Sequence, residues 1–202
     1  MEIIRGKQIS FMDTAALAEQ RAQYERIHMD IGTGDGRFVQ HIAQNNPHCF
    51  AIGVDACRAN LSMTRRAPTN TLFVIANAQA LPSELYGLAA HITINFPWGS
   101  LIEGLLAEDR GLLAGLNRIA RPDATLSICL NSSALREVGW SLEAGAGQVQ
   151  TVLSGHGFRV RPPLKLQSGE LRSYPTTWAK RLAFGRDPRA VCIHATKKSG
   201  SS

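Results

Sequence analysis

The sequence predicts an α/β fold in which a mainly parallel sheet carries helices on both of its faces. Strand-like apolar runs alternate with segments of helical periodicity along most of the 202 residues, as in a sheet covered by helices. The chain is long enough for one full hydrophobic core, and it shows no internal repeat and no interdomain linker. We therefore expect a single domain over residues 1–198, followed by a disordered tail at 199–202.

The first elements are a short β-hairpin and a helix. Residues 2–12 read as two short strands around Gly6, and Asp13 is a suitable N-cap for a helix that runs to about Glu25. Strands and helices then alternate up to the middle of the chain, with strands at 26–32, 49–55, 71–77 and 91–96 and helices at 37–44 and 59–66. The apolar run at 49–55 is typical of a strand buried on both faces.

The second half continues this alternation. A helix is expected over 100–120, where one face would hold Leu101, Leu105, Leu112, Leu116 and Ile119. Further strands are expected at 124–131, 158–165 (bent at Pro162–Pro163) and 190–196, and further helices at 145–154 and 176–184. These strands give a seven-stranded, mainly parallel sheet with an N-terminal hairpin beside it.

Composition excludes several classes of protein. No apolar run approaches the ~18 residues that a membrane span needs, and the first residues lack the apolar stretch of a signal peptide, so we expect a cytoplasmic protein. The four cysteines show no CxxC spacing. Three of them lie in apolar, strand-like runs, which favours reduced core residues over disulfides or zinc ligands, and no metal is expected.

The positive charge is clustered. A net charge of +6 fits a polyanionic partner such as nucleic acid. One cluster lies in a C-terminal segment and a smaller one follows the strand at 49–55; they comprise Lys180, Arg181, Arg186 and Arg189, and Arg58, Arg65 and Arg66.

The strongest local motif is HMDIGTGDG at 28–36, a strand that leads into a glycine turn and then a helix. Glycines let a ligand approach the backbone without a Cβ in the way. Asp30 precedes the turn and would face an ammonium group, while Asp55 ends the next strand, where it can accept hydrogen bonds from ribose hydroxyls. Asp30 and Asp35 would repel a pyrophosphate, and the GxGxG spacing differs from the dinucleotide fingerprint. The motif therefore favours S-adenosylmethionine (SAM), the alternative being a tight turn without a ligand.

Two tryptophans point to a base-binding site. The strand at 91–96 ends in Asn95-Phe96-Pro97-Trp98-Gly99-Ser100, at the sheet edge where ligands bind in parallel folds. Trp178 lies within the C-terminal basic cluster. Two such rings can hold an extruded base between them, each stack contributing roughly 1–3 kcal/mol. The alternative is that both tryptophans are ordinary packing residues under loops.

Three motifs together resemble a known family. GTGDGR at 32–37, FPWGS at 96–100 and WAKRLAFGR at 178–186 are similar to the kanamycin–apramycin resistance methyltransferases, which modify N1 of the decoding-site adenine in 16S rRNA. The resemblance runs over nearly the whole chain. It implies a Rossmann-like class I SAM-dependent methyltransferase fold, SAM as methyl donor, and the 30S subunit as substrate, with aminoglycoside resistance as the outcome.

The resemblance also implies roles for individual residues. Trp98 and Trp178 are expected to stack on and position the target adenine. Cofactor contacts are expected from Asp30, Gly32, Thr33, Gly34, Asp55, Ala56, Ala78, Gln79, Asn95 and Ser100. RNA contacts are expected from Arg65, Arg66, Lys180, Arg181, Arg186 and Arg189.

The sequence departs from the family pattern in four places. The linker at 65–71 is short and lacks a Lys/Gly-rich stretch, and the segment 132–150 is short and lightly charged. Gln79 stands where a glutamate is expected, and Asn95 stands where an apolar residue is expected.

Other activities remain open at this level. The run Asn95-Phe96-Pro97-Trp98 partly matches the [N/D]PP[aromatic] loop of amino-group methyltransferases, but its first proline is missing, which favours N1 over N6 of adenine. A tRNA guanine-N7 or other RNA methyltransferase, a small-molecule methyltransferase and a non-catalytic binder are the further alternatives. We expect a monomer.

Overall fold

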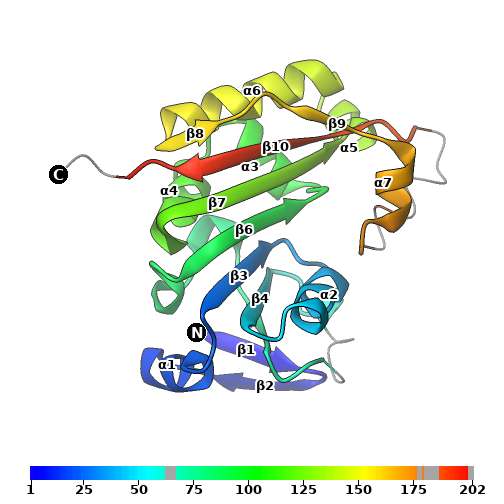
Figure 1. The fold of residues 1–202 in the computed structure, drawn as a ribbon. Coiled ribbons are helices and arrows are strands. Elements are labelled where there is room, and N and C mark those ends of the chain that lie inside the picture. The colour runs from blue at the N-terminus through cyan, green and yellow to red at the C-terminus, as the bar shows by residue number, and fades with distance from the viewer. Residues whose placement is uncertain (62–66, 177–178, 180–186, 200–202) are drawn as a thin grey trace.

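The computed structural model describes residues 1–61, 67–176, 179 and 187–199, and it shows one continuous twisted sheet with helices on both sides (Figure 1). The sheet order is β2-β1-β5-β4-β3-β6-β7-β10-β8, with β9 also paired to β10. The strands are β1(Glu2–Arg5), β2(Gln8–Phe11), β3(Arg26–Ile31), β4(Cys49–Asp55), β5(Thr71–Ile75), β6(Ala89–Asn95), β7(Ala120–Asn131), β8(Phe158–Val160), β9(Leu164–Leu166) and β10(Ala190–Lys197).

The centre of the sheet is parallel and its rims are antiparallel. β5, β4, β3, β6 and β7 run in one direction, so their carboxyl ends meet at the same edge. The sequence predicted seven strands with a hairpin beside them, whereas the described residues join the hairpin and the other strands into one sheet of ten strands. The hairpin adds two because β1 pairs with β5 (Ile3 opposite Val74), and the predicted strand at 158–165 is two strands. Pro162 and Pro163 have no N–H for the ladder, so β8 and β9 pair with β10 separately.

Helices cover both faces of this sheet. They are α1(Thr14–Arg21), α2(Arg37–Asn45), α3(Ser100–Leu106), α4(Arg110–Ile119), α5(Ser132–Glu137), α6(Leu142–Gly155) and α7(Ser168–Ser173), with single 3-10 turns η2(Ala78–Ala80) and η3(Ser83–Leu85). In Figure 1, α2 and α7 lie in front of the sheet and α3 lies behind it. The largest core cluster joins the central strands to α3, α4 and α6, and smaller clusters lie under α2 and α7.

Several predicted elements need correction. The helix expected over 100–120 is two helices, because Asp109 caps α4 by accepting a hydrogen bond from Leu112 N (2.8 Å) and Glu108 has a φ of 59°. The helices α5 and α7 were not predicted. The predicted helices at 59–66 and 176–184 lie mostly outside the described residues. In the predicted tail, Ser199 donates a hydrogen bond to Asp123 Oδ1 (2.8 Å), and 200–202 lie outside the description.

The expectation that the strand cysteines are reduced was wrong for two of them. Cys129 and Cys192 lie opposite each other on the antiparallel strands β7 and β10, with Cα atoms 4.1 Å apart, and form a disulfide. Cys49 is a buried free thiol and Cys57 an exposed one. Across the described residues, none of the helices combines the length and the apolar character that crossing a bilayer requires.

Candidate active site

A cavity of about 560 Å³ opens at the carboxyl ends of β3, β4, β5 and β6. This is the volume range of small-molecule sites, and the location is the one at which parallel sheets bind ligands. All ten residues predicted to contact the cofactor line it, and so does Trp98; the ten are Asp30, Gly32, Thr33, Gly34, Asp55, Ala56, Ala78, Gln79, Asn95 and Ser100. The fold thus brings together side chains from four strands and the loops that follow them.

The glycine turn after β3 forms one wall of the cavity. Gly32 has a φ of 73°, and a Cβ on it would lie 2.6 Å from Leu101 Cδ2, so no other residue fits without movement. A Cβ on Gly34, where φ is 57°, would meet no atom within 4 Å. The backbone at Gly34 is therefore open toward the cavity, as a closely approaching ligand requires.

Asp55 is held by the backbone at the end of β4. Its Oδ2 accepts a hydrogen bond from Gly34 N (2.8 Å), and its Oδ1 accepts from Cys57 N (2.8 Å) and Asn60 Nδ2 (3.3 Å). A carboxylate has about four acceptor positions, so one remains on Oδ2. The side chain is thus fixed in place and can still accept a hydrogen bond from a ligand hydroxyl.

Asp30 is a buried carboxylate without a cation beside it among the described residues. It is 1% exposed, and its Oδ1 accepts hydrogen bonds from Thr93 Oγ1 (2.6 Å) and Asn95 Nδ2 (2.8 Å). Burial raises its pKa to about 6, and these hydrogen bonds offset part of that effect. An ammonium group entering the cavity would supply the missing opposite charge.

The buried polar groups around Asp30 are connected to one another. Thr93 donates its only proton to Asp30, so His28 Nε2, at 3.0 Å from Thr93 Oγ1, must be the donor to that oxygen. Burial lowers the pKa of His28 to about 4, and the charge of His91 contributes further, so this ring is neutral at pH 7. Thr33 Oγ1, also on the cavity wall, is buried beside Asp30 and helps to lower the pKa of that carboxyl, but it forms no hydrogen bond of normal geometry. A polar ligand at this end of the cavity would satisfy it.

The wall after β5 explains one departure from the family pattern. Asn77 Oδ1 accepts a hydrogen bond from Gln79 N (2.9 Å), which shapes the turn η2. Gln79 Nε2 donates to Asp109 Oδ2 (3.3 Å) at the start of α4. A glutamate at position 79 would bring two carboxylates together here, whereas the glutamine amide can donate. Asn77 lines the cavity and was not among the predicted residues.

The opposite wall is the loop after β6. Phe96 is buried and has a φ of 53°, a rare conformation for an aromatic residue that holds the following turn in one shape. Trp98 is partly buried and lines the cavity together with Pro97 and Ser100. Trp178 lies outside the described residues, but Thr176, two residues before it, reaches the cavity wall.

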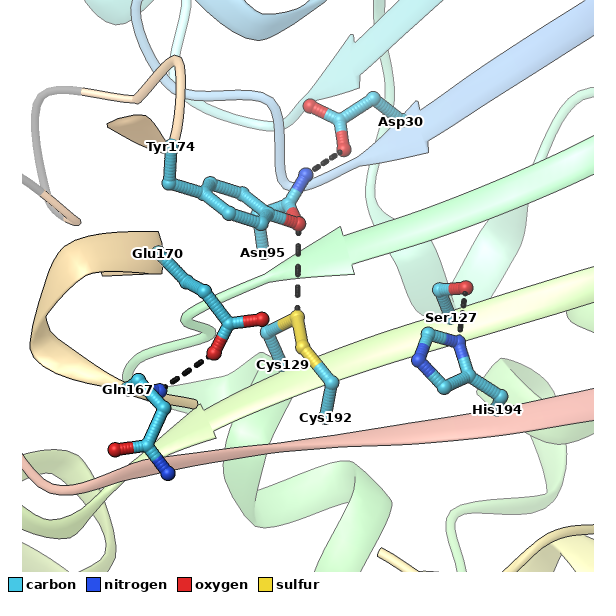
Figure 2. Close-up of a disulfide and its surroundings, with 9 residues drawn as sticks. All are labelled: Asp30, Asn95, Ser127, Cys129, Gln167, Glu170, Tyr174, Cys192 and His194. Carbon is cyan, nitrogen blue, oxygen red and sulfur yellow. Dashed lines mark hydrogen bonds between the residues drawn. A yellow bond between two sulfur atoms is a disulfide. The ribbon is translucent and has the colours of Figure 1, made fainter. Parts of the chain in front are cut away.

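Asn95 is engaged on both sides of its amide. Its Nδ2 donates to Asp30, and its Oδ1 accepts a hydrogen bond from the Tyr174 hydroxyl (2.6 Å) (Figure 2). An amino-group methyltransferase would use this side chain to hold the exocyclic amine of its target, and here it is already occupied. Sequence reasoning missed Tyr174, because nothing in the local pattern at 167–175 distinguishes it from a loop residue.

The predicted RNA-binding residues lie mostly outside the described part of the chain. Arg65, Arg66, Lys180, Arg181 and Arg186 lie outside the described residues. Arg189 is described, and its guanidinium forms a two-point ion pair with Asp187 (2.8 and 3.0 Å). That hydrogen bonding holds the pKa of Asp187 well below its usual range. The charge of Arg189 is therefore largely compensated in this conformation.

Comparison with known proteins agrees with this geometry. A family model described as NpmA, 16S rRNA (adenine(1408)-N(1))-methyltransferase, matches residues 2–197. An Escherichia coli protein of the same enzyme name is 33% identical over 205 residues, which cover 92% of this chain and 94% of the relative. A protein of that name from Streptoalloteichus hindustanus is 29% identical over 204 residues, covering 93% and 94%.

Solved structures give the same result. The 16S rRNA methyltransferase KamB superposes with a TM-score of 0.88 at 25% identity, covering 98% of this chain and 100% of that one. A mutant 16S rRNA (adenine(1408)-N(1))-methyltransferase from Catenulisporales acidiphilia, crystallised with its cosubstrate SAM, superposes with a TM-score of 0.87 at 25% identity over 100% and 99%. The fold is that of SAM-dependent methyltransferases, and the chain belongs to the 16S rRNA (adenine(1408)-N(1))-methyltransferase family.

Proposed function

We propose that this protein transfers a methyl group from SAM to N1 of the decoding-site adenine of 16S rRNA in the 30S subunit, and that it confers aminoglycoside resistance. The observation that carries the proposal is the cavity itself. It places a buried carboxylate without a cation, Asp30, a backbone-fixed carboxylate, Asp55, and the ring of Trp98 around one volume. The family match over residues 2–197 supports the choice of substrate.

The cavity residues fit SAM group by group. Asp30 would hold the ammonium group, Asp55 would accept hydrogen bonds from the ribose, and the backbone at Gly32 and Gly34 leaves room for close approach. Ala78 and Gln79, which line the cavity after β5, would flank the adenine ring. The sulfonium of SAM makes its methyl group electrophilic.

The remaining task of the protein is to orient the target base. Adenine N1 has its own lone pair and is neutral at pH 7, so no general base is needed. Of the described residues that line the cavity, only Asp30, Asp35 and Asp55 are titratable. Asp30 is already assigned to the ammonium group of SAM and Asp55 to its ribose. Trp98 and Trp178 would stack on the base and stabilise the cationic product by cation–π attraction, on the order of 0.5–2 kcal/mol.

The basic residues complete the substrate assignment. The basic residues Lys180, Arg181 and Arg186, with Arg65 and Arg66, would hold rRNA phosphates. Because the proposed substrate is a ribosomal subunit, we propose that the enzyme acts in the cytoplasm, and that it acts as a monomer.

Methyl transfer from tritiated SAM to purified 30S subunits tests this function, with free 16S rRNA and bulk tRNA assayed in parallel. Primer extension then maps the product, because N1 methylation blocks base pairing. We expect label on 30S subunits with a single stop at the decoding-site adenine. Label on tRNA would instead assign a different RNA substrate, and SAM binding without label on any RNA would contradict the proposed activity.

A further inference from the structure

Tyr174 connects the proposed cofactor site to the segment that leads to Trp178. Figure 2 shows its hydroxyl beside the Asn95 amide, which in turn meets Asp30. The ring stacks on Phe38 of α2 (centroids 5.8 Å apart, planes at 11°) and meets Phe96 edge-on (5.5 Å, 74°). Three elements distant in the sequence, α2, β6 and the end of α7, therefore meet at this one side chain.

The direction of each hydrogen bond follows from donor and acceptor chemistry. An ionised Asp30 can only accept, so the Asn95 amide must turn its NH₂ group toward it. That orientation leaves Asn95 Oδ1 partly buried on the other side and in need of a donor, which the Tyr174 hydroxyl supplies (2.6 Å). Burial and the neighbouring Asp30 charge raise the pKa of Tyr174 further above its usual value, so it remains a donor at all working pH values.

Without the Tyr174 hydroxyl as a donor, the Asn95 side-chain amide can adopt a second orientation. Asn95 could then rotate and present its carbonyl oxygen to Asp30, an arrangement that suits a protonated Asp30, which can donate, and repels an ionised one. The Tyr174 hydroxyl therefore favours the amide orientation that supports the charged form of Asp30. The charged form is the one that binds a cation.

We propose that Tyr174 is a positioning residue for SAM binding, which acts by fixing the Asn95 amide as a donor to Asp30. The inference rests on the proposed function of the cavity, and it goes beyond that function because Tyr174 itself does not line the cavity. The same residue anchors the chain toward the target-base side: Thr176 N donates to Tyr174 O (2.9 Å), and Thr176 is on the cavity wall.

Asp30 has a defined set of charged and titratable neighbours. Asp55 from β4 opposes its ionisation, His28 lies on its own strand and is neutral, and Tyr174 comes from the end of α7. Thr93 and Asn95 on β6 are its neutral donors. Removal of the Tyr174 hydroxyl leaves these other neighbours unchanged. Any resulting change in the pKa of Asp30 must therefore act through Asn95.

The test is the SAM dissociation constant of Tyr174→Phe, measured by titration calorimetry at pH 6 and pH 8. Phenylalanine keeps the ring contacts with Phe38 and Phe96 and removes only the hydroxyl. At pH 6 we expect the dissociation constant of the variant to be about three- to tenfold higher than that of the wild type, which is the range of one hydrogen bond. At pH 8 Asp30 is ionised in both proteins, so the ratio of the two dissociation constants should fall toward one. Affinity for 30S subunits should not change.

Matched controls separate this role from a structural one. Tyr24→Phe and Tyr86→Phe remove hydroxyls that bond to Gln23 and to Leu81 O, away from the cavity, and should leave the SAM affinity as it is. In an Asn95→Leu background, Tyr174→Phe should have no further effect on SAM binding.

Three outcomes would overturn the proposal: an unchanged dissociation constant, an equal loss at both pH values, or full additivity with Asn95→Leu. Failure of the wild-type protein to bind SAM is a separate result, because it would contradict the proposed function rather than the role of Tyr174.

Discussion

At the scale of single residues, the two carboxylates Asp30 and Asp55 differ in their surroundings. Asp30 is 1% exposed and accepts hydrogen bonds from two neutral side chains on β6, while Asp55 is held by two backbone N–H groups and Asn60. A buried carboxylate costs free energy unless an opposite charge meets it. The two carboxylates are therefore expected to contribute differently to binding: Asp30 recognises charge, whereas Asp55 recognises hydroxyl groups.

SAM affinity should depend on pH through Asp30. Its pKa of about 6 in the free protein means that SAM binding requires loss of a proton below that pH. We expect the affinity measured by calorimetry to fall up to about tenfold per pH unit below pH 6 and to level off above it. A flat profile between pH 5 and pH 7 would show that Asp30 does not face the ammonium group.

The pH dependence of unfolding reports the ionisation of Asp30 less clearly than ligand binding does. The raised pKa of Asp30 means that its contribution to the free energy of unfolding falls as pH rises from about 4 to about 6. The pKa of His28 is lowered from 6.5 to about 4, so its contribution rises over nearly the same window. The two effects oppose each other, and ligand binding isolates Asp30.

Replacing Asp55 tests the other carboxylate. We expect Asp55→Ala to weaken SAM binding by about 1.5–3 kcal/mol, as for a lost charge-assisted hydrogen bond. Isothermal titration at pH 7.5 measures this directly, with the melting temperature as a control for folding. An affinity equal to that of wild type would remove Asp55 from the ribose assignment.

At the scale of elements, the loops after the parallel strands carry the site and the antiparallel rim supports it. β10 pairs along its length with β7, and the disulfide between Cys129 and Cys192 links these two strands under α7. Tyr174 follows α7 and lies 3.5 Å from Cys129 Sγ (Figure 2). The rim strands thus support the residue that holds Asn95.

The disulfide gives a simple prediction. Denatured protein kept without reductant should react with a thiol reagent at two cysteines, Cys49 and Cys57, and at all four after reduction. In the native state only the exposed Cys57 should react quickly. The disulfide would be contradicted if four cysteines reacted in denatured protein without reductant. It would also be contradicted if the number of reactive cysteines did not increase after reduction.

Element prediction succeeded where the local pattern was strong. The strand at 49–55 has the predicted bounds, and β3, α2, β5 and β6 lie within two residues of theirs. It failed where a single capping residue or a tertiary contact decided the outcome. Asp109 divides the predicted helix at 100–120, and Pro162–Pro163 divide one strand into two.

For the whole molecule, the net charge of +6 sets the expected partner and its salt dependence. Binding to 30S subunits should weaken as salt rises, with a slope of log K against log salt of about −0.7 to −0.9 per neutralised phosphate. Lys180→Ala should reduce that slope by about one phosphate. Arg189→Ala should reduce it less, because Asp187 already pairs with Arg189. Equal slopes for wild type and Lys180→Ala would exclude Lys180 from the RNA contact.

The sequence by itself determined the parallel core, the cofactor type and the ten predicted cofactor residues that line the cavity. Glycine spacing, strand-end carboxylates and apolar periodicity are local properties of the sequence. A parallel sheet then brings the loops that follow its strands to one edge. Only the tertiary structure decided which side chains complete the network. Tyr174 meets Asn95 across 79 positions and Cys129 meets Cys192 across 63, and such contacts depend on strand order and register rather than on neighbouring residues.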